Sequence, residues 1–65
     1  MNFSENLKSL RKTNKIDQKE LAKVINVSAK TVSHWETGYT EPSISQLILL
    51  ANYFDVTVDE LIGKI

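Results

Sequence analysis

The chain has 65 residues, of which 42% are hydrophobic, and it contains one proline, two glycines and no cysteine. A chain of this length builds one small domain, and its composition excludes both a disordered segment and a secreted module held together by disulfides. Its eight basic and eight acidic side chains give a formal net charge of zero, which predicts weak nonspecific affinity for polyanions.

No apolar run approaches the roughly 20 residues that cross a bilayer, and the N-terminal segment lacks the charged and then apolar layout of a signal peptide. We therefore expect a cytoplasmic protein without a membrane partner. The chain starts at Met1 and has the signals of a fifth helix near its end, so we expect it to be complete. A fragment of a longer protein is the alternative.

The first helix is expected to begin after Asn2 and to reach about Thr13. Asn2 is followed three residues later by Glu5, a spacing that resembles a capping box. Apolar residues recur on one face of this segment. They are Phe3, Leu7 and Leu10.

Two further helices follow, separated by a very short joint. Asp17 with Glu20 starts the second helix, which should end at Asn26 because asparagine tolerates the left-handed conformation that the joint requires. Ser28 caps the third helix, and Gly38 ends it.

The fourth helix is expected from Ile44 to about Phe54, after a loop that Pro42 keeps out of helical geometry. Ser43 and Gln46 form its capping box. Its apolar stripe is wide enough to mark it as the central packing element. The stripe consists of Ile44, Leu47, Ile48, Leu50, Ala51 and Phe54.

A short fifth helix completes the pattern. Asp55 and Val56 make a turn, after which Thr57 and Glu60 form another capping box. No segment alternates with the period of a strand, so the predicted fold is an all-α bundle of five helices. The apolar residues of the fifth helix are Val58, Leu61 and Ile62.

The second and third helices form the most informative unit of the chain, residues 17–37. Two short helices that follow each other so closely cannot lie parallel, and their apolar residues put both inner faces on one side. The inner residues are Leu21, Ala22, Ile25, Val27, Val32 and Trp35. The outward row on the third helix consists of Ala29, Lys30, Ser33 and His34.

This unit resembles the helix-turn-helix of the phage repressor/Cro family of DNA-binding domains. The resemblance extends over nearly the whole chain, and it implies a lambda-repressor-like fold that binds double-stranded DNA with its third helix in the major groove. The matching residues are Gln18, Ser28, Trp35, Glu36, Gly38 and Pro42.

The resemblance places base contacts on the outward row of the third helix. Lys30 can donate to the O6 and N7 acceptors of guanine, and Ala29 can offer a methyl group to thymine. Ser33 and His34 can each donate or accept a hydrogen bond. The alternative for all four is an ordinary solvated helix face. A catalytic or metal role for His34 is not expected, because the sequence has no second histidine and no cysteine.

Phosphate contacts are implied at the ends of the two helices, where free N–H groups favour anions. In the family, the glutamine that matches Gln18 holds a phosphate and also braces the third helix. The acidic residues Asp17 and Glu41 count against tight binding. Further hydroxyl candidates, whose alternative is capping or simple exposure, are Ser28, Thr31, Thr37 and Thr40.

Arg11 and Glu36 match a pair that forms a salt bridge in this family. The pair is expected to tie the first helix to the end of the third, in a geometry that permits a bidentate contact. The expected role of the pair is structural. Contact of Arg11 with a phosphate is the alternative.

Charge is distributed unevenly along the sequence. Residues 1–34 carry seven basic and three acidic side chains, whereas residues 35–65 carry one basic and five acidic side chains. The two parts have net charges of +4 and −4, and this polarity orients the molecule on a polyanion although the total is zero.

A single reading helix contacts few base pairs, so domains of this kind usually act as dimers on palindromic sites. The apolar residues left over after the core is assigned form the candidate dimer surface. Completion of a small core is the alternative role for them. They are Leu49, Tyr53, Val56, Ile62 and Ile65.

The predicted function is therefore a sequence-specific transcriptional regulator, in particular a small repressor that occupies an operator as a homodimer. One alternative is an antitoxin-type regulator that also holds a partner protein, and another is a protein-interaction module without DNA affinity. No enzyme activity, cofactor or small-molecule ligand is expected, because the sequence offers no nucleophile with a base, no metal cluster and no phosphate-binding glycine loop.

Overall fold

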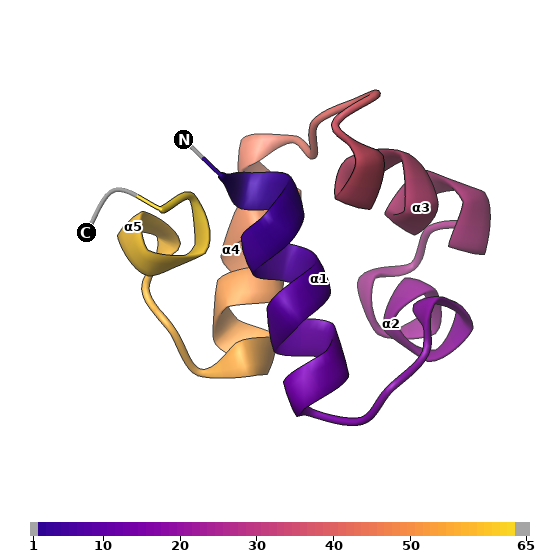
Figure 1. The fold of residues 1–65 in the computed structure, drawn as a ribbon, viewed down its shortest axis with the longest axis horizontal. Helices are drawn as coiled ribbons and strands as arrows, with labels where there is room; N and C mark the ends of the chain where they lie inside the picture. The colour runs from indigo at the N-terminus through magenta and orange to yellow at the C-terminus, as the bar shows by residue number, and fades with distance from the viewer. Residues whose placement is uncertain (1, 64–65) are drawn as a thin grey trace.

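The computed structural model describes residues 2–63, so the candidate dimer residue Ile65 lies outside the described residues. All regular structure in this range is helical, which confirms the predicted all-α class. Figure 1 shows α1 in front of α4, with α5 on one side and α2 and α3 on the other. The five helices are α1 (Phe3–Thr13), α2 (Gln18–Ile25), α3 (Ala29–Thr37), α4 (Ile44–Phe54) and α5 (Val58–Leu61).

Four of the helices begin at a residue whose side chain caps them. Asp17, Ser28, Ser43 and Thr57 each accept a hydrogen bond from the backbone N–H three residues later, at 2.8–3.2 Å. All four have extended backbone geometry, which aims the side chain at the free N–H groups of the first turn. The return hydrogen bond that completes a capping box is made by Glu20, Gln46 and Glu60.

The expected capping box of α1 is absent, and the prediction for Asn2 and Glu5 is wrong. Asn2 has φ −121° and ψ 46°, and its side chain makes no capping hydrogen bond. A capping side chain needs an extended backbone at its own residue, and the spacing of Asn2 and Glu5 in the sequence does not specify that backbone.

Three helices end in a residue with left-handed backbone. These residues are Asn26 with φ 65°, Gly38 with φ 80° and Asp55 with φ 57°, and the prediction for Asn26 is confirmed. In each case the next residue donates its N–H to a carbonyl of the last helical turn at 2.9–3.0 Å. These bonds use carbonyl groups that would otherwise lack partners, and they reverse the chain within two residues.

Every helix contributes to one core. Each provides one aliphatic side chain with no exposed surface, so even the four-residue α5 is anchored by Leu61. These side chains are Leu7, Leu21, Val32, Leu50 and Leu61. The other buried hydrophobic residues around them are Phe3, Ala22, Ile25, Trp35, Ala51 and Phe54.

Helix α4 is less central than its sequence predicts. Ile44 is 77% exposed and Ile48 is 48% exposed, so their assignment to the core stripe is wrong. At about 100° per residue, they lie roughly 70–110° from the centre of the stripe that reaches the core. Helices α1 and α2 both pack extensively on α3. The structural centre is therefore shared between α3 and α4.

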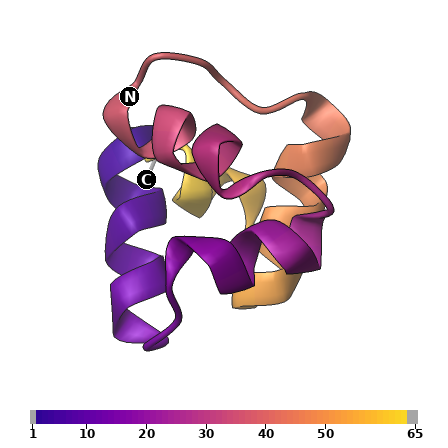
Figure 2. The ribbon, with the colours of Figure 1, turned by 90° about the vertical axis from the view of Figure 1, so that its right-hand side faces the viewer.

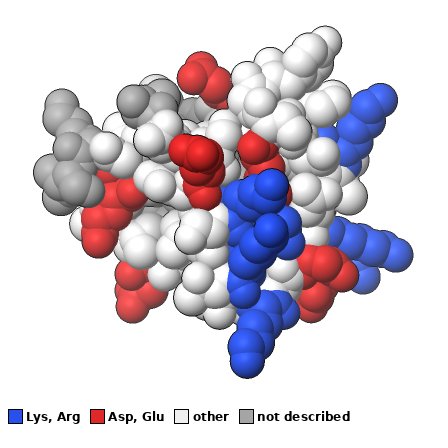
Figure 3. All heavy atoms as spheres, in the orientation of Figure 1, with Lys and Arg blue, Asp and Glu red and all other residues white. Residues whose placement is uncertain are grey.

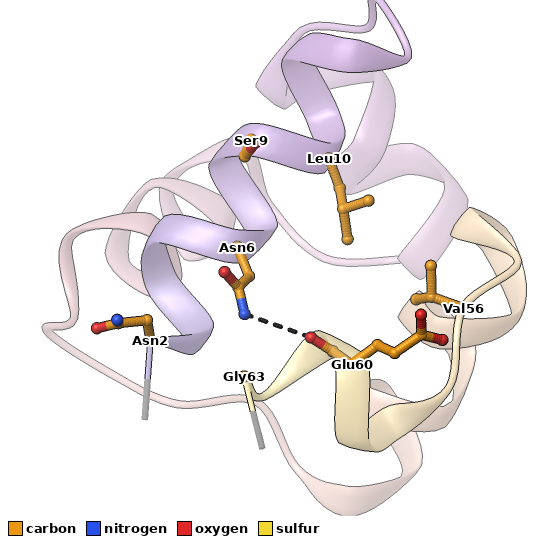
Figure 4. A pocket seen from close by; sticks show the side chains of 7 residues that line it. All are labelled: Asn2, Asn6, Ser9, Leu10, Val56, Glu60 and Gly63. Atoms are coloured by element: carbon orange, nitrogen blue, oxygen red, sulfur yellow. Dashed lines mark hydrogen bonds between the residues drawn. The ribbon is translucent and has the colours of Figure 1, made fainter. Parts of the chain in front are cut away.

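Helix α5 is held against α1 by one polar side chain. The amide nitrogen of Asn6 donates to the carbonyl oxygens of Glu60 and Leu61 at 3.3 and 3.2 Å. Figure 4 shows this contact in the open groove between α1 and α5, where Val56 and Leu10 also point inward. Asn6 thereby supplies donors to the last carbonyl groups of a short helix.

Candidate nucleic-acid interface

The α2–α3 joint fixes the two helices of the helix-turn-helix at an angle. Val27 donates its N–H to the carbonyl of Ala22 at 2.9 Å across the left-handed Asn26, and Ser28 caps α3 immediately afterwards. Figure 2 shows α2 and α3 facing the viewer, with α1 and α4 on either side. The pair therefore lies on one surface of the molecule, with α3 available to a ligand.

The two faces of α3 differ sharply in exposure. Val32 has no exposed surface and Trp35 is 2% exposed, so the inward face is locked into the core. On the opposite side, the Ala29 and Lys30 side chains are exposed. Ser33 and His34 are half-buried at the edge of this face. The four residues assigned to base reading thus lie along one polar side of a single rigid helix.

The end of this polar face contains a contact between two aromatic rings that the sequence pattern does not specify. The rings of His34 and Tyr39 lie with their centroids 4.8 Å apart and their planes tilted by 60°. Tyr39 follows Gly38, whose left-handed backbone turns the chain back over the last turn of α3. The sequence feature that makes such a contact possible is a glycine C-cap followed by a large side chain.

The four candidate hydroxyl groups are in different bonding states. The Ser28 and Thr31 hydroxyl oxygens lie 2.9 Å apart, and Ser28 also accepts the N–H of Thr31. Thr37 donates its hydroxyl proton to the carbonyl of His34 at 3.2 Å, so that proton is already used within α3. Thr40 is exposed on the loop after α3.

Glu36 joins three helices at one carboxylate. Arg11 of α1 donates to it through Nε at 2.6 Å and through Nη2 at 3.1 Å, and Gln18 of α2 donates through Nε2 at 3.0 Å. The remaining Nη1 of Arg11 donates to the carbonyl of Ile16 at 3.0 Å. The bidentate ion pair expected from the sequence is present, and it fixes the end of α3 relative to α1 and the start of α2.

Burial of Glu36 by itself would raise the pKa of its carboxyl group. The hydrogen bonds donated by Arg11 and Gln18, together with the positive charges of Arg11 and Lys8, outweigh burial and hold this pKa below its ordinary value of 4.5. The hydrogen bond to Glu36 correspondingly raises the pKa of Arg11. Both groups are therefore charged across the physiological range.

We expect the stability of the fold to fall in acid. Because the pKa of Glu36 is lower in the folded state, the unfolded chain takes up the proton first as the pH falls. The stability contributed by the ionised carboxylate is present above pH 4.5 and is lost as the pH falls through the lower folded value. Glu60, whose pKa is lowered by the backbone N–H and hydroxyl of Thr57, acts in the same direction.

Thermal unfolding followed by circular dichroism from about pH 7 to about pH 3 tests this expectation. The Tm should fall below about pH 4.5, and it should fall less steeply in Glu36→Gln, which cannot titrate at this position. Equal acid dependence in both proteins would show that Glu36 does not contribute to the effect.

Charged side chains are distributed unevenly over the surface. In Figure 3, blue side chains gather over α1 and along the side of α2 and α3, and red ones occur around α5 and also beside the blue ones. Acidic groups also lie near the basic ones, as Asp17 does at the start of α2. The basic side of the molecule therefore includes the side that carries α3.

Two other kinds of site are absent from residues 2–63. No helix there is both long and apolar enough to pass through a membrane. No three histidine, cysteine, aspartate or glutamate residues in this range gather to hold a metal ion.

Known proteins share both the sequence pattern and the fold. The HTH-type transcriptional activator BcrR of Enterococcus faecalis is 37% identical over 63 residues, which are 97% of this chain and 31% of that protein. A transcriptional regulator from Listeria innocua superposes with a TM-score of 0.93 and 40% identity, covering 97% of this chain and 59% of that one. The P22 c2 repressor, solved in complex with a synthetic operator, superposes with a TM-score of 0.88 and 33% identity, covering 94% and 92%.

The curated relatives are longer than this chain, which spans 31% of the length of BcrR and 52% of the AnsR regulator of Bacillus subtilis. A model of the helix-turn-helix family matches residues 7–61, which is most of the chain. The chain belongs to the helix-turn-helix family of the phage repressor/Cro type.

Proposed function

We propose that this protein binds a specific sequence of double-stranded DNA through α3 and acts as a small transcriptional regulator, in particular a repressor. The observation that carries the proposal is the polar face of α3 on a helix whose other side is locked by Val32, Trp35 and Glu36. A rigid helix with its variable side chains outward is the element that enters a major groove. The operator-bound state of the P22 c2 repressor supports this assignment.

Each outward side chain has a chemically distinct role in this proposal. Lys30, exposed near the start of α3, donates to guanine O6 or N7. Ala29 contacts a thymine methyl group, which requires only that its own methyl is unobstructed. Ser33 and His34 lie one turn later, where they donate to or accept from a neighbouring base pair.

Phosphate anchoring falls chiefly to the start of α2. Gln18 uses one amide N–H for Glu36, which leaves the second for a phosphate oxygen. The same hydrogen bond joins Gln18 to Glu36 of α3, so the position of the phosphate contact is fixed relative to the reading helix. Thr40 and the paired Ser28 and Thr31 hydroxyls are further anchors, whereas Thr37 contributes only after it releases its bond to His34.

The dependence of affinity on salt tests DNA binding. A labelled pool of random duplexes should be retained at low ionic strength, and the logarithm of the association constant should fall linearly with the logarithm of the salt concentration. A protein-interaction module would retain no duplex at any salt concentration. A flat salt dependence would also contradict the proposal, because phosphate contacts always release counterions.

We further propose that the protein occupies a palindromic operator as a homodimer. Leu49 and Tyr53, one turn apart on α4, are 49% and 41% exposed, and the Tyr53 ring packs edge-on against Phe54. Val56 and Ile62, the other described candidates, are half-buried, and Val56 packs against the core. An exposed aliphatic and aromatic pair on a rigid helix is the type of patch that a second copy of the chain would cover.

Replacing Leu49 with lysine should weaken this dimer at least about tenfold, because a buried interface would then contain an unpaired charge. Ile44→Lys is the matched control, since Ile44 is 77% exposed on the other flank of α4 and should not affect association. Sedimentation of the three proteins at micromolar concentration, with and without the selected duplex, measures the effect. Only a 7.4 kDa species in the wild type without duplex, together with a single chain per duplex when the duplex is present, would contradict the dimer.

A further inference from the structure

Tyr39 is the most exposed aromatic side chain among the described residues, and the core does not explain its position. Its side chain is 76% exposed, and the partner of its ring is the imidazole of His34, at a centroid distance of 4.8 Å. The core aromatics Phe3, Trp35 and Phe54 are all less than 10% exposed. The exposed ring of Tyr39 therefore contacts the half-buried His34 at the end of the polar face of α3.

The backbone makes this contact a fixed one. Gly38 adopts φ 80° and donates its N–H to Trp35, while Tyr39 donates its N–H to the carbonyl of His34 at 2.9 Å. This is the hydrogen-bonding pattern of a Schellman motif, in which the second residue after the helix packs on the residue five positions before it. Tyr39 and His34 occupy these two positions, so the C-cap itself brings the rings together.

A histidine side chain on an open helix face would be mobile. It has two common χ1 rotamers in a helix and two broad orientations about χ2, which gives about four states. A neighbouring ring that contacts one of these states selects it before any ligand arrives. The imidazole is then already ordered in the free protein, so its ordering does not reduce the free energy of binding to DNA.

We propose that Tyr39 is a positioning residue that holds the imidazole of His34 in the orientation used for reading a base. This inference rests on the proposed function, because it concerns the quality of a base contact made by α3. It assigns to the loop after α3 a role in specificity that is separate from any contact of the loop with phosphate. The Tyr39 hydroxyl group has no part in it, since the contact is made by the ring.

The first arm of the test uses the free protein and requires no DNA. Nuclear Overhauser effects between the two rings and an upfield shift of the His34 ring protons are expected in the wild type. The shift should disappear in Tyr39→Ala and remain in Tyr39→Phe. Absence of both signals in the folded wild type would overturn the inference, whether or not the protein binds DNA.

The second arm is a double-mutant cycle on a selected duplex. His34→Ala identifies the base pair whose preference depends on His34, and the preference there is then measured in Tyr39→Ala. We expect it to fall about two- to fourfold, because the competent orientation is diluted among about four states. Tyr39→Phe should retain the preference. In the His34→Ala background, Tyr39→Ala should have no further effect at this base pair.

The outcomes distinguish a failure of the proposed DNA-binding function from a failure of the proposed role of Tyr39. If no duplex is retained by the wild type, the proposed function fails. If duplexes are retained but Tyr39→Ala weakens all of them equally, Tyr39 acts on the backbone of DNA and the inference is overturned. If Tyr39→Phe behaves like Tyr39→Ala, the hydroxyl group is responsible and the inference is overturned as well. Circular dichroism of each variant checks that α3 stays folded.

Discussion

Replacing Glu36 with alanine is expected to lower the free energy of unfolding by about 3 kcal/mol. Glu36 is 8% exposed, and its carboxylate receives three hydrogen bonds from Arg11 and Gln18. Its removal would leave the Arg11 guanidinium, whose side chain is 12% exposed, without its anionic partner. An uncompensated charge in a largely buried position is among the few single changes with an effect of this size.

The loss would remove much of the stability of so small a domain. A single core of this size supplies no more than about 3–5 kcal/mol. Glu36→Ala should therefore be partly unfolded near body temperature, and urea denaturation followed by Trp35 fluorescence would measure the change at a lower temperature.

Two controls make the interpretation specific. Glu36→Gln keeps an oxygen acceptor in place and should be less destabilised than Glu36→Ala. Asp59→Ala removes a carboxylate from an exposed position and should change the free energy of unfolding by less than about 0.5 kcal/mol. A loss below about 1 kcal/mol for Glu36→Ala would place this ion pair among ordinary surface pairs.

Replacing Lys30 with alanine is expected to reduce discrimination at a single base pair of the operator by about 1–3 kcal/mol. Lys30 is exposed on α3 and makes no hydrogen bond to another described residue, so its removal leaves the fold intact. The ammonium group is a compact donor suited to the two acceptors of guanine. The binding of the selected duplex and of its single-base variants, measured at one fixed salt concentration, gives the discrimination directly.

Lys12→Ala is the matched control, since it removes the same charge from an exposed position on α1. It should weaken all duplexes by a similar factor and leave the preferred sequence unchanged. If Lys30→Ala also weakens every duplex equally, Lys30 contacts phosphate, and its role in base reading is wrong.

The boundaries of the helices could be predicted from local chemistry. Asp17, Ser43 and Thr57 each have their partner three residues later, and such capping boxes form wherever the first residue is extended. Asn2 has the same spacing but lacks the extended backbone. A spacing rule therefore succeeds only where the preceding chain permits the required geometry.

The packing of α4 shows the limit of periodicity. Ile44 and Ile48 extend an apolar stripe that is continuous with Leu47 and Ala51, and nothing in the spacing marks where the stripe leaves the core. Which edge of a wide stripe is covered depends on where the other helices lie. The positions of the other helices depend on residues throughout the chain, so they cannot be inferred from the spacing within α4.

The polar face of α3 follows from its period and from the resemblance to known regulators, whereas the bonding state of each group does not. The sequence cannot show that the Thr37 hydroxyl is already bonded to the His34 carbonyl, or that Tyr39 contacts His34. Both depend on the geometry after Gly38. The glycine C-cap is visible in the sequence, and the residue after it is the one that the cap directs toward the last turn of the helix.

Selection of preferred sequences from a random duplex library tests the central claim most directly. At low ionic strength the wild type should enrich one short motif in two inverted copies, with centres about 10 base pairs or a multiple of this distance apart. The same selection with Lys30→Ala should yield that motif with one position per half relaxed. Recovery of unenriched sequences by the folded wild type would contradict the assignment of α3 as a helix that reads DNA.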